Sequence, residues 1–181
     1  MKSKTIAILG VDGSGKSTVV NNLHFRYGDR CVVTYMGYKD FEDSRIKELK
    51  NKRFATPIIV FRIYRCFWRR YLNAIKSDKI AIFDRYVHEI FINAEGRFRR
   101  INILLYRYLF PMPSLIVYLH CSAEESLKRK DDIINEDIFK AMKRRFDEFF
   151  LNRKGVLCLD SGSLSSDEIT SRICELIDKS F

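Results

Sequence analysis

Residues 10–18 have the sequence GVDGSGKST and stand between a short apolar run at residues 5–9 and a stretch with helical character at residues 16–27. An unbroken apolar run of this length is typical of a strand that is buried on both faces of a parallel sheet. Gly28 follows the helical stretch as a natural C-terminal cap. The opening of the chain therefore predicts a strand, a glycine-rich turn and a helix in direct succession.

The glycine-rich stretch fits the pattern G-x-x-x-x-G-K-[ST], which between a strand and a helix marks a phosphate-binding P-loop. Its glycines let the backbone curl so that successive N–H groups point at phosphate oxygens. Lys16 adds a positive charge for the outer phosphates, and Ser17 offers a hydroxyl to Mg²⁺. The loop therefore predicts a nucleoside triphosphate site, here taken as ATP with Mg²⁺. Its expected members are Asp12, Gly13, Ser14, Gly15, Lys16, Ser17 and Thr18.

Further apolar runs alternate with helical stretches along the rest of the chain. The runs lie at residues 31–35, 79–83, 115–119 and 155–159. Helices are expected at residues 57–76, 137–151 and 166–179. Helical sequence also follows the run at residues 79–83 as far as residue 110, and a capping box at Ser122 and Glu125 begins a further helix. This alternation predicts an α/β fold, a P-loop NTPase three-layer sandwich with a five-stranded parallel sheet flanked by helices. One domain over residues 1–181 is expected.

Composition limits the partners. The 33 Lys and Arg residues against 23 Asp and Glu give a net charge of +10, which favours nucleic acid, an anionic membrane surface or phosphorylated small molecules. The five cysteines are scattered and form no CxxC pair, which is typical of the reducing cytoplasm. Neither a signal peptide nor an apolar stretch near the ~20 residues of a membrane span is visible, so a cytoplasmic location is expected.

Asp84 and Arg85 follow the apolar run at residues 79–83 and give the second chemical signal. A guanine-reading N-K-x-D motif is absent after any run, and a strand ending in paired acids, typical of motor ATPases, is absent too. An acid beside a base suits phosphoryl transfer to a bound acceptor, because Asp84 can serve Mg²⁺ or orient the attacking oxygen and Arg85 can hold an anion. A surface ion pair at the end of a strand is the alternative interpretation.

With these motifs, the sequence resembles the thymidylate kinase family of P-loop kinases. The resemblance rests on GVDGSGKST, on Asp84-Arg85-Tyr86 after a strand, on a short basic segment near Lys128-Arg129-Lys130, and on Leu159-Asp160-Ser161 before the last helix. It spans nearly the whole chain in order and spacing. It implies phosphoryl transfer from ATP to a nucleoside monophosphate, dTMP or a related deoxynucleotide.

The resemblance also implies roles for residues at matching positions. Asp12 would approach the acceptor nucleotide, and Asp84 and Arg85 would serve the metal and the acceptor phosphate. Phe61 and Arg65 have the spacing of a pair that stacks on and hydrogen-bonds the base, although core packing with a snorkelling arginine explains the spacing equally well. Asp160 and Ser161 would lie near the adenine. The catalytic residues expected in this way are Lys16, Asp84, Arg85 and Arg129.

A basic lid is expected at about residues 128–136, where positive charge would neutralise the transferred phosphoryl group and exclude water. Arg129 and, on the following helix, Arg144 are its candidate catalytic cations, while a solvated helix face paired with nearby acids is the alternative.

Two departures from the family leave the acceptor open. Residues 35–38 (YMGY) stand where the family has Arg-Glu-Pro, and residues 87–92 (VHEIFI) replace its Ser, Tyr and Gln positions. A nucleoside or a sugar is therefore an alternative acceptor. An ATP-binding protein that contacts nucleic acid or a membrane through the Arg-rich stretch at residues 53–76 is a further alternative. A homodimer is left open.

Overall fold

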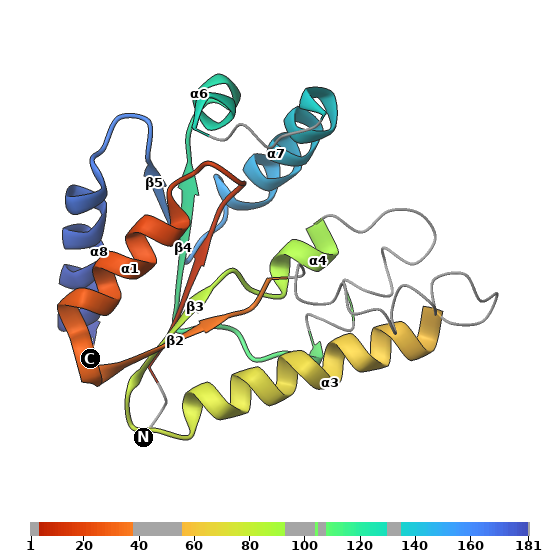
Figure 1. The fold of residues 1–181 in the computed structure, drawn as a ribbon, viewed down its shortest axis with the longest axis vertical. Coiled ribbons are helices and arrows are strands. Elements are labelled where there is room, and N and C mark those ends of the chain that lie inside the picture. The colour runs from red at the N-terminus through yellow and green to blue at the C-terminus, as the bar shows by residue number, and fades with distance from the viewer. Residues whose placement is uncertain (1–3, 38–55, 93–103, 105–107, 130–134, 181) are drawn as a thin grey trace.

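The computed structural model describes residues 4–37, 56–92, 104, 108–129 and 135–180 (Figure 1). Its centre is a five-stranded parallel sheet with the strand order β2-β3-β1-β4-β5. The strands are β1 (Thr5–Leu9), β2 (Cys31–Tyr35), β3 (Ile80–Asp84), β4 (Leu115–His120) and β5 (Val156–Asp160). All five predicted strands are confirmed. β3 and β5 each begin and end one residue later than expected, which makes Asp84 and Asp160 the last residues of their strands.

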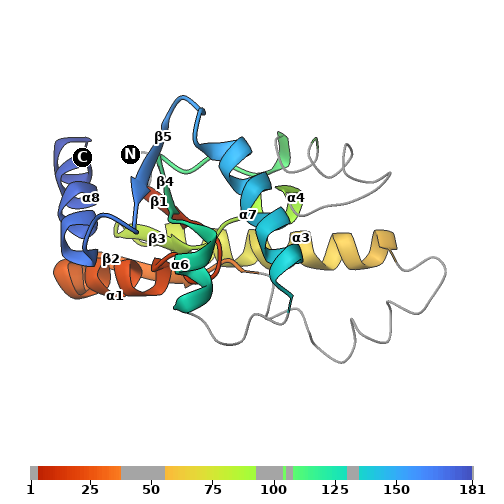
Figure 2. The same ribbon diagram turned by 90° about the horizontal axis from the view of Figure 1, so that it is seen from above.

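Helices cover both faces of the sheet, as the views in Figures 1 and 2 show. The helices are α1 (Lys16–Tyr27), the 3₁₀ turn η1 (Gly28–Arg30), α3 (Thr56–Ile75), α4 (His88–Ile92), α6 (Ala123–Lys128), α7 (Glu136–Phe150) and α8 (Ser166–Ser180). α1 and α8 lie together on one face, and α3, α4 and α7 lie on the other. This arrangement confirms the predicted three-layer fold. Most of the expected helix between α4 and residue 110, and residues 130–134 of the expected lid, lie outside the described residues.

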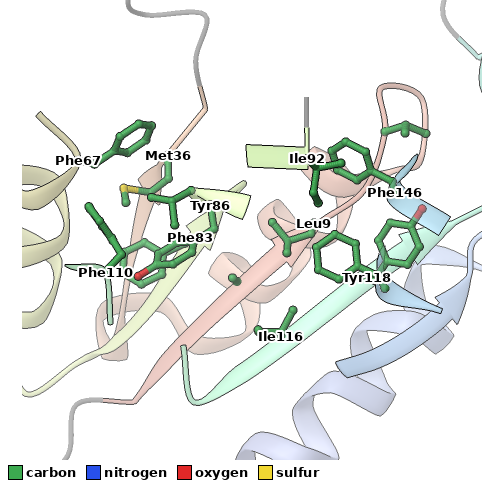
Figure 3. Packing of buried hydrophobic residues seen from close by; sticks show 14 of the residues in the cluster. Leu9, Met36, Phe67, Phe83, Tyr86, Ile92, Phe110, Ile116, Tyr118 and Phe146 are labelled. Atoms are coloured by element: carbon green, nitrogen blue, oxygen red, sulfur yellow. The ribbon is translucent and has the colours of Figure 1, made fainter. Parts of the chain in front are cut away.

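Side chains of each strand alternate between two cores because successive residues of a strand point to opposite faces. In β1, Ala7 and Leu9 join the core beneath α3, α4 and α7, whereas Ile6 and Ile8 join the core beneath α1 and α8. The first core is rich in aromatic rings, and Figure 3 shows Phe83 and Phe110 within it. Each fully buried side chain of this size stabilises the fold by roughly 1.5–3 kcal/mol. The two cores fix the sheet and thereby the loops at its carboxyl edge.

α3 follows the amphipathic pattern expected from the sequence. Its inward face buries Ile63 and Phe67, and the ring of Phe67 meets the edge of Phe110 at 6.1 Å between centroids. Arg62 and Arg69 are exposed on the opposite face. Among the helices of the described residues, none combines the length and the apolar character that a membrane crossing requires.

The helix caps at the carboxyl edge of the sheet are local features of the sequence. Ser122 caps α6 by accepting a hydrogen bond from the backbone N–H of Glu125 at 3.1 Å, as the predicted capping box requires. The Glu125 carboxylate accepts a hydrogen bond from Arg129 at 2.9 Å. A reciprocal capping box forms before α8. The side chain of Ser165 accepts from the backbone N–H of Glu168, and the side chain of Glu168 accepts from the backbone N–H of Ser165. These caps set where α6 and α8 begin, next to the loops at the carboxyl edge of the sheet.

Candidate functional site

The glycine-rich loop connects β1 to α1 at the carboxyl edge of the sheet, beside the ends of β3 and β4. Gly13 and Gly15 have φ values of +80° and +82°, which side chains rarely adopt. A Cβ on Gly13 would lie 2.5 Å from the carbonyl oxygen of Ser126, so the glycine lets the loop approach α6. A Cβ on Gly15 would meet no atom within 4 Å, which means that the space beside Gly15 is open. The loop thus combines a tightly packed side with an open one.

Lys16 begins α1 but its side chain turns back into the loop. Its Nζ donates a hydrogen bond of 2.6 Å to the carbonyl oxygen of Val11 and lies 3.9 Å from Oδ1 of Asp12. The residue is only 5% exposed. Burial, together with the charge of Arg85, lowers the pKa of Lys16 to about 8, against the opposing effect of the neighbouring carboxylates. The adjacent Ser17 and Thr18 side chains are exposed on the first turn of α1.

Asp84 ends β3 and is held by backbone bonds to the strands on both sides. Its carbonyl oxygen accepts from the N–H of Met36 at 2.8 Å, and the N–H of the following Arg85 donates to the carbonyl oxygen of Ile8 at 3.0 Å. The carboxylate oxygen Oδ1 of Asp84 is buried and has no hydrogen-bond partner within the part of the chain that the structure describes. Burial raises the pKa of Asp84, although Lys16 and Arg85 both favour its ionised form. Such an orphaned carboxylate oxygen is able to accept from a metal-bound water or a substrate.

Arg85 lies between two carboxylates. Its guanidinium forms an ion pair with Asp12 of the glycine-rich loop, and its Nη1 donates to both carboxylate oxygens of Glu89 at 3.0 and 2.8 Å. Among the described residues, Arg85 is the one non-glycine residue with a positive φ, +69°. Gly37 after β2 leaves room for the arginine, because a Cβ there would lie 2.6 Å from Cδ of Arg85. The structure therefore brings the predicted residues Asp12, Lys16, Asp84 and Arg85 into one cluster.

Glu89 belongs to this cluster but was not among the site residues expected from the sequence. It lies in α4, four residues after Arg85, and its side chain is 10% exposed. Burial raises its pKa, whereas the arginine favours the carboxylate. The rule that residues four apart meet on a helix could not have found this pair, because Arg85 has a positive φ and lies before α4.

A first prediction concerns the pH dependence of ATP binding at Lys16. Because the pKa of Lys16 is about 8 and the phosphates require the protonated amine, the Kd for ATP should rise above pH 8, approaching tenfold per pH unit. Titration of ATP into the protein between pH 7 and pH 10 measures this dependence. In Lys16→Arg, whose guanidinium stays protonated, the Kd should remain flat over the same range. A flat profile for the wild-type protein would contradict the prediction.

Other predicted residues lie elsewhere. Phe61 and Arg65 are exposed on α3, Phe61 by 67%, and do not join the cluster around Arg85. Arg144 is also exposed and pairs with Glu148 in α7 at 2.9 Å. His88, next to the cluster in sequence, is buried and packs its ring against Phe150 at 5.8 Å between centroids.

Asp160 and Ser161 form a separate group at the end of β5. Oδ1 of Asp160 accepts from the N–H of Gly162 at 2.9 Å, and the N–H of Ser161 donates to the carbonyl oxygen of His120 at 2.7 Å. Arg129 at the end of α6 donates to the carbonyl oxygen of Ser161 at 3.0 Å. The structure thus joins Arg129 to the loop predicted to lie near adenine, and not to the glycine-rich loop.

The chain is similar to known kinases in sequence and in fold. No family model matches the chain. A thymidylate kinase from Brachyspira hyodysenteriae is 24% identical over 71% of this chain and 68% of the relative. A probable thymidylate kinase 1 from Saccharolobus solfataricus is also 24% identical and covers 97% of both chains. These relatives confirm the resemblance stated from the sequence.

Solved structures share the fold at lower identity. The thymidylate kinase from Candida albicans has a TM-score of 0.74 and 18% identity, covering 98% of this chain and 92% of its own. A deoxyadenosine kinase from M. mycoides, solved with dCMP and dCDP, has a TM-score of 0.69 and 17% identity, covering 97% and 99%. Both likenesses confirm the P-loop NTPase sandwich predicted from the strand pattern.

Proposed function

We propose that this chain, which is a divergent thymidylate kinase-like protein and a kinase-like phosphotransferase, transfers the γ-phosphoryl group of ATP to a nucleoside monophosphate. The observation that carries the proposal is the ion pair between Asp12 of the glycine-rich loop and Arg85 at the end of β3. This pair links a phosphate-binding loop to a cation suited to an acceptor phosphate. In the reaction, an acceptor phosphate oxygen attacks the γ-phosphorus, the bond to the β–γ bridging oxygen breaks, and ADP leaves.

The donor is held by the glycine-rich loop. The space beside Gly15 is open, and α1 begins next to it at Lys16. The N–H groups of the first turn of α1 and the partial positive charge of its N-terminus would bind the donor phosphates there. Lys16, whose Nζ donates to the carbonyl oxygen of Val11, would exchange that carbonyl for a phosphate oxygen. Asp160 and Ser161 would border the adenine, with Arg129 fixing their loop.

The chemistry of this cluster fits Mg²⁺. The orphaned, buried oxygen of Asp84 and the exposed hydroxyl of Ser17 are hard oxygen donors of the kind that Mg²⁺ prefers, directly or through water. Mg²⁺ bound by Ser17 and Asp84 would neutralise charge on the donor phosphates. The protein's own contribution is to position the two substrates and to exclude water, which supplies much of the acceleration in phosphoryl transfer.

A nucleoside is the second candidate acceptor. Two carboxylates already form ion pairs with the guanidinium of Arg85, which favours this acceptor. The uncharged hydroxyl of a nucleoside does not have to compete with these carboxylates for the arginine. One of the solved structures with a similar fold is that of a deoxyadenosine kinase, which is consistent with this alternative.

An acceptor screen tests the proposal. The full chain is incubated with ATP and Mg²⁺ and with each deoxynucleoside monophosphate, each deoxynucleoside and a set of sugars, and ADP formation is measured. We expect acceptor-dependent ADP formation with at least one deoxynucleoside monophosphate and none with sugars. Products are identified by mass. If the protein binds ATP but no nucleotide or nucleoside supports ADP formation, the proposed function is contradicted.

A further inference from the structure

The environment of Arg85 is unusual for a residue that receives an acceptor phosphate, because anionic groups of the protein already bind it. Asp12 contacts one terminal nitrogen, and Glu89 receives two hydrogen bonds from the other. The Arg85 side chain is 18% exposed and that of Glu89 is 10% exposed, so water screens this pair only weakly. Charge-assisted hydrogen bonds of this kind are stronger than those between neutral groups.

The net charge of the cluster also indicates that protein carboxylates neutralise Arg85. Its cations are Lys16 and Arg85, and its carboxylates are Asp12, Asp84 and Glu89, which leaves one net negative charge when all are ionised. Lys16 belongs to the loop that holds the donor phosphates. Arg85 is therefore the cation of the cluster that remains for the acceptor, and Glu89 neutralises it.

We propose that Glu89 is a specificity-determining residue that competes with the acceptor phosphate for Arg85. A phosphate-bearing acceptor can form an ion pair with Arg85 only if it displaces the Glu89 carboxylate or binds against the repulsion from that carboxylate. An uncharged acceptor meets neither cost. Glu89 thus lowers the affinity of the site for nucleoside monophosphates relative to nucleosides. This inference rests on the proposed function, because it concerns the acceptor of that same site.

The position of Glu89 supports a tuning role over a purely structural one. The backbone turn at Arg85 is already fixed by the bond from its N–H to the carbonyl oxygen of Ile8 at 3.0 Å, and by the Asp12 ion pair. Glu89 adds charge at the arginine without being needed to anchor that turn. A neutral isostere, Glu89→Gln, keeps the size of the side chain and one hydrogen-bond acceptor while it removes the negative charge.

The experiment compares thymidine and thymidine monophosphate as acceptors for the wild-type protein and Glu89→Gln. Glu89→Gln should raise the ratio of kcat/KM for the monophosphate over that for thymidine by at least about tenfold, mainly through a lower KM, because a like charge near the phosphate is removed. The matched control is Glu148→Gln, which removes the exposed partner of Arg144 in α7 and should leave the ratio unchanged. An unchanged ratio in Glu89→Gln, or an equal loss with both acceptors, would overturn the proposal.

Binding separates this inference from the proposed function. Thymidine monophosphate is titrated into each protein saturated with a non-hydrolysable ATP analogue, and Glu89→Gln should bind it at least about tenfold more tightly than the wild type does. Equal or weaker binding overturns the role of Glu89 even when turnover is seen. If Glu89→Gln binds thymidine monophosphate more tightly but neither protein turns it over, the role of Glu89 is supported and the proposed function is contradicted. If Glu89→Gln does not fold, Glu89→Asp, whose shorter carboxylate cannot keep both bonds to Arg85, should shift the ratio in the same direction by less, and no shift overturns the proposal.

Discussion

Replacement of Lys16 by Met will reduce kcat for ATP-dependent phosphotransfer by about 10³-fold, the size of effect seen when one preorganised charge at a developing anion is removed. Lys16 is the cation of the glycine-rich loop, and its Nζ lies on the inner side of that loop against the carbonyl oxygen of Val11. Met has a similar length and no charge, so it fills the buried space but cannot neutralise a phosphate. ADP formation with the best acceptor measures the loss.

The fold should survive this substitution. Lys16 is 5% exposed, and burial of its charge opposes folding, which is why its pKa is lowered to about 8. Met removes that cost, so the melting temperature should stay equal or rise. Lys140→Met, which removes an exposed partner of Glu136 at 3.2 Å, is the control and should keep its activity. Full phosphotransfer by Lys16→Met would show that the loop does not act as assigned.

The central strands β1, β3 and β4 could be predicted because burial on both faces leaves a simple signal. The edge strands β2 and β5 are partly exposed but are also built around short apolar runs, and β1 and β2 were located to the residue. Strand order has no comparable signal, because β2, β3 and β4 are all flanked by helical sequence and only long-range packing decides which strand pairs with β1. Even so, the loops at the carboxyl edge could be grouped in advance, since parallel strands place their ends on one side of the sheet.

The site could be predicted only where one segment carries the chemistry. The glycine-rich loop holds its glycines and lysine within nine residues, and Asp84 and Arg85 follow directly on a strand. The contact of Arg129 with the Ser161 carbonyl oxygen joins residues 32 apart in the chain, and the sequence contains no sign of it. The positive φ of Arg85 is equally invisible, because it follows from bonds to Ile8 on a neighbouring strand.

Replacement of Asp84 by Asn will lower kcat on the order of 10²-fold and stabilise the protein at neutral pH. The activity falls because Asn keeps the shape but offers an uncharged oxygen where the orphaned Oδ1 of Asp84 now lies. The stability rises because burial raises the pKa of Asp84, so the ionised carboxylate is less favourable in the folded than in the unfolded protein. At pH 7 the gain should be a few degrees in melting temperature.

The pH dependence gives this prediction its sign. A carboxyl whose pKa is raised on folding destabilises the fold increasingly as the pH rises from its unfolded pKa, the ordinary 3.8, through its folded value. The melting temperature of Asp84→Asn should therefore exceed that of the wild type most at pH 7 to 8, and the difference should shrink toward pH 4. Asp29→Asn, which removes an exposed carboxylate in η1, is the control variant and should keep its activity. A difference that is constant from pH 4 to pH 8 would mean that Asp84 is not a buried charge held at a cost to stability, and wild-type turnover by Asp84→Asn would remove it from the chemistry.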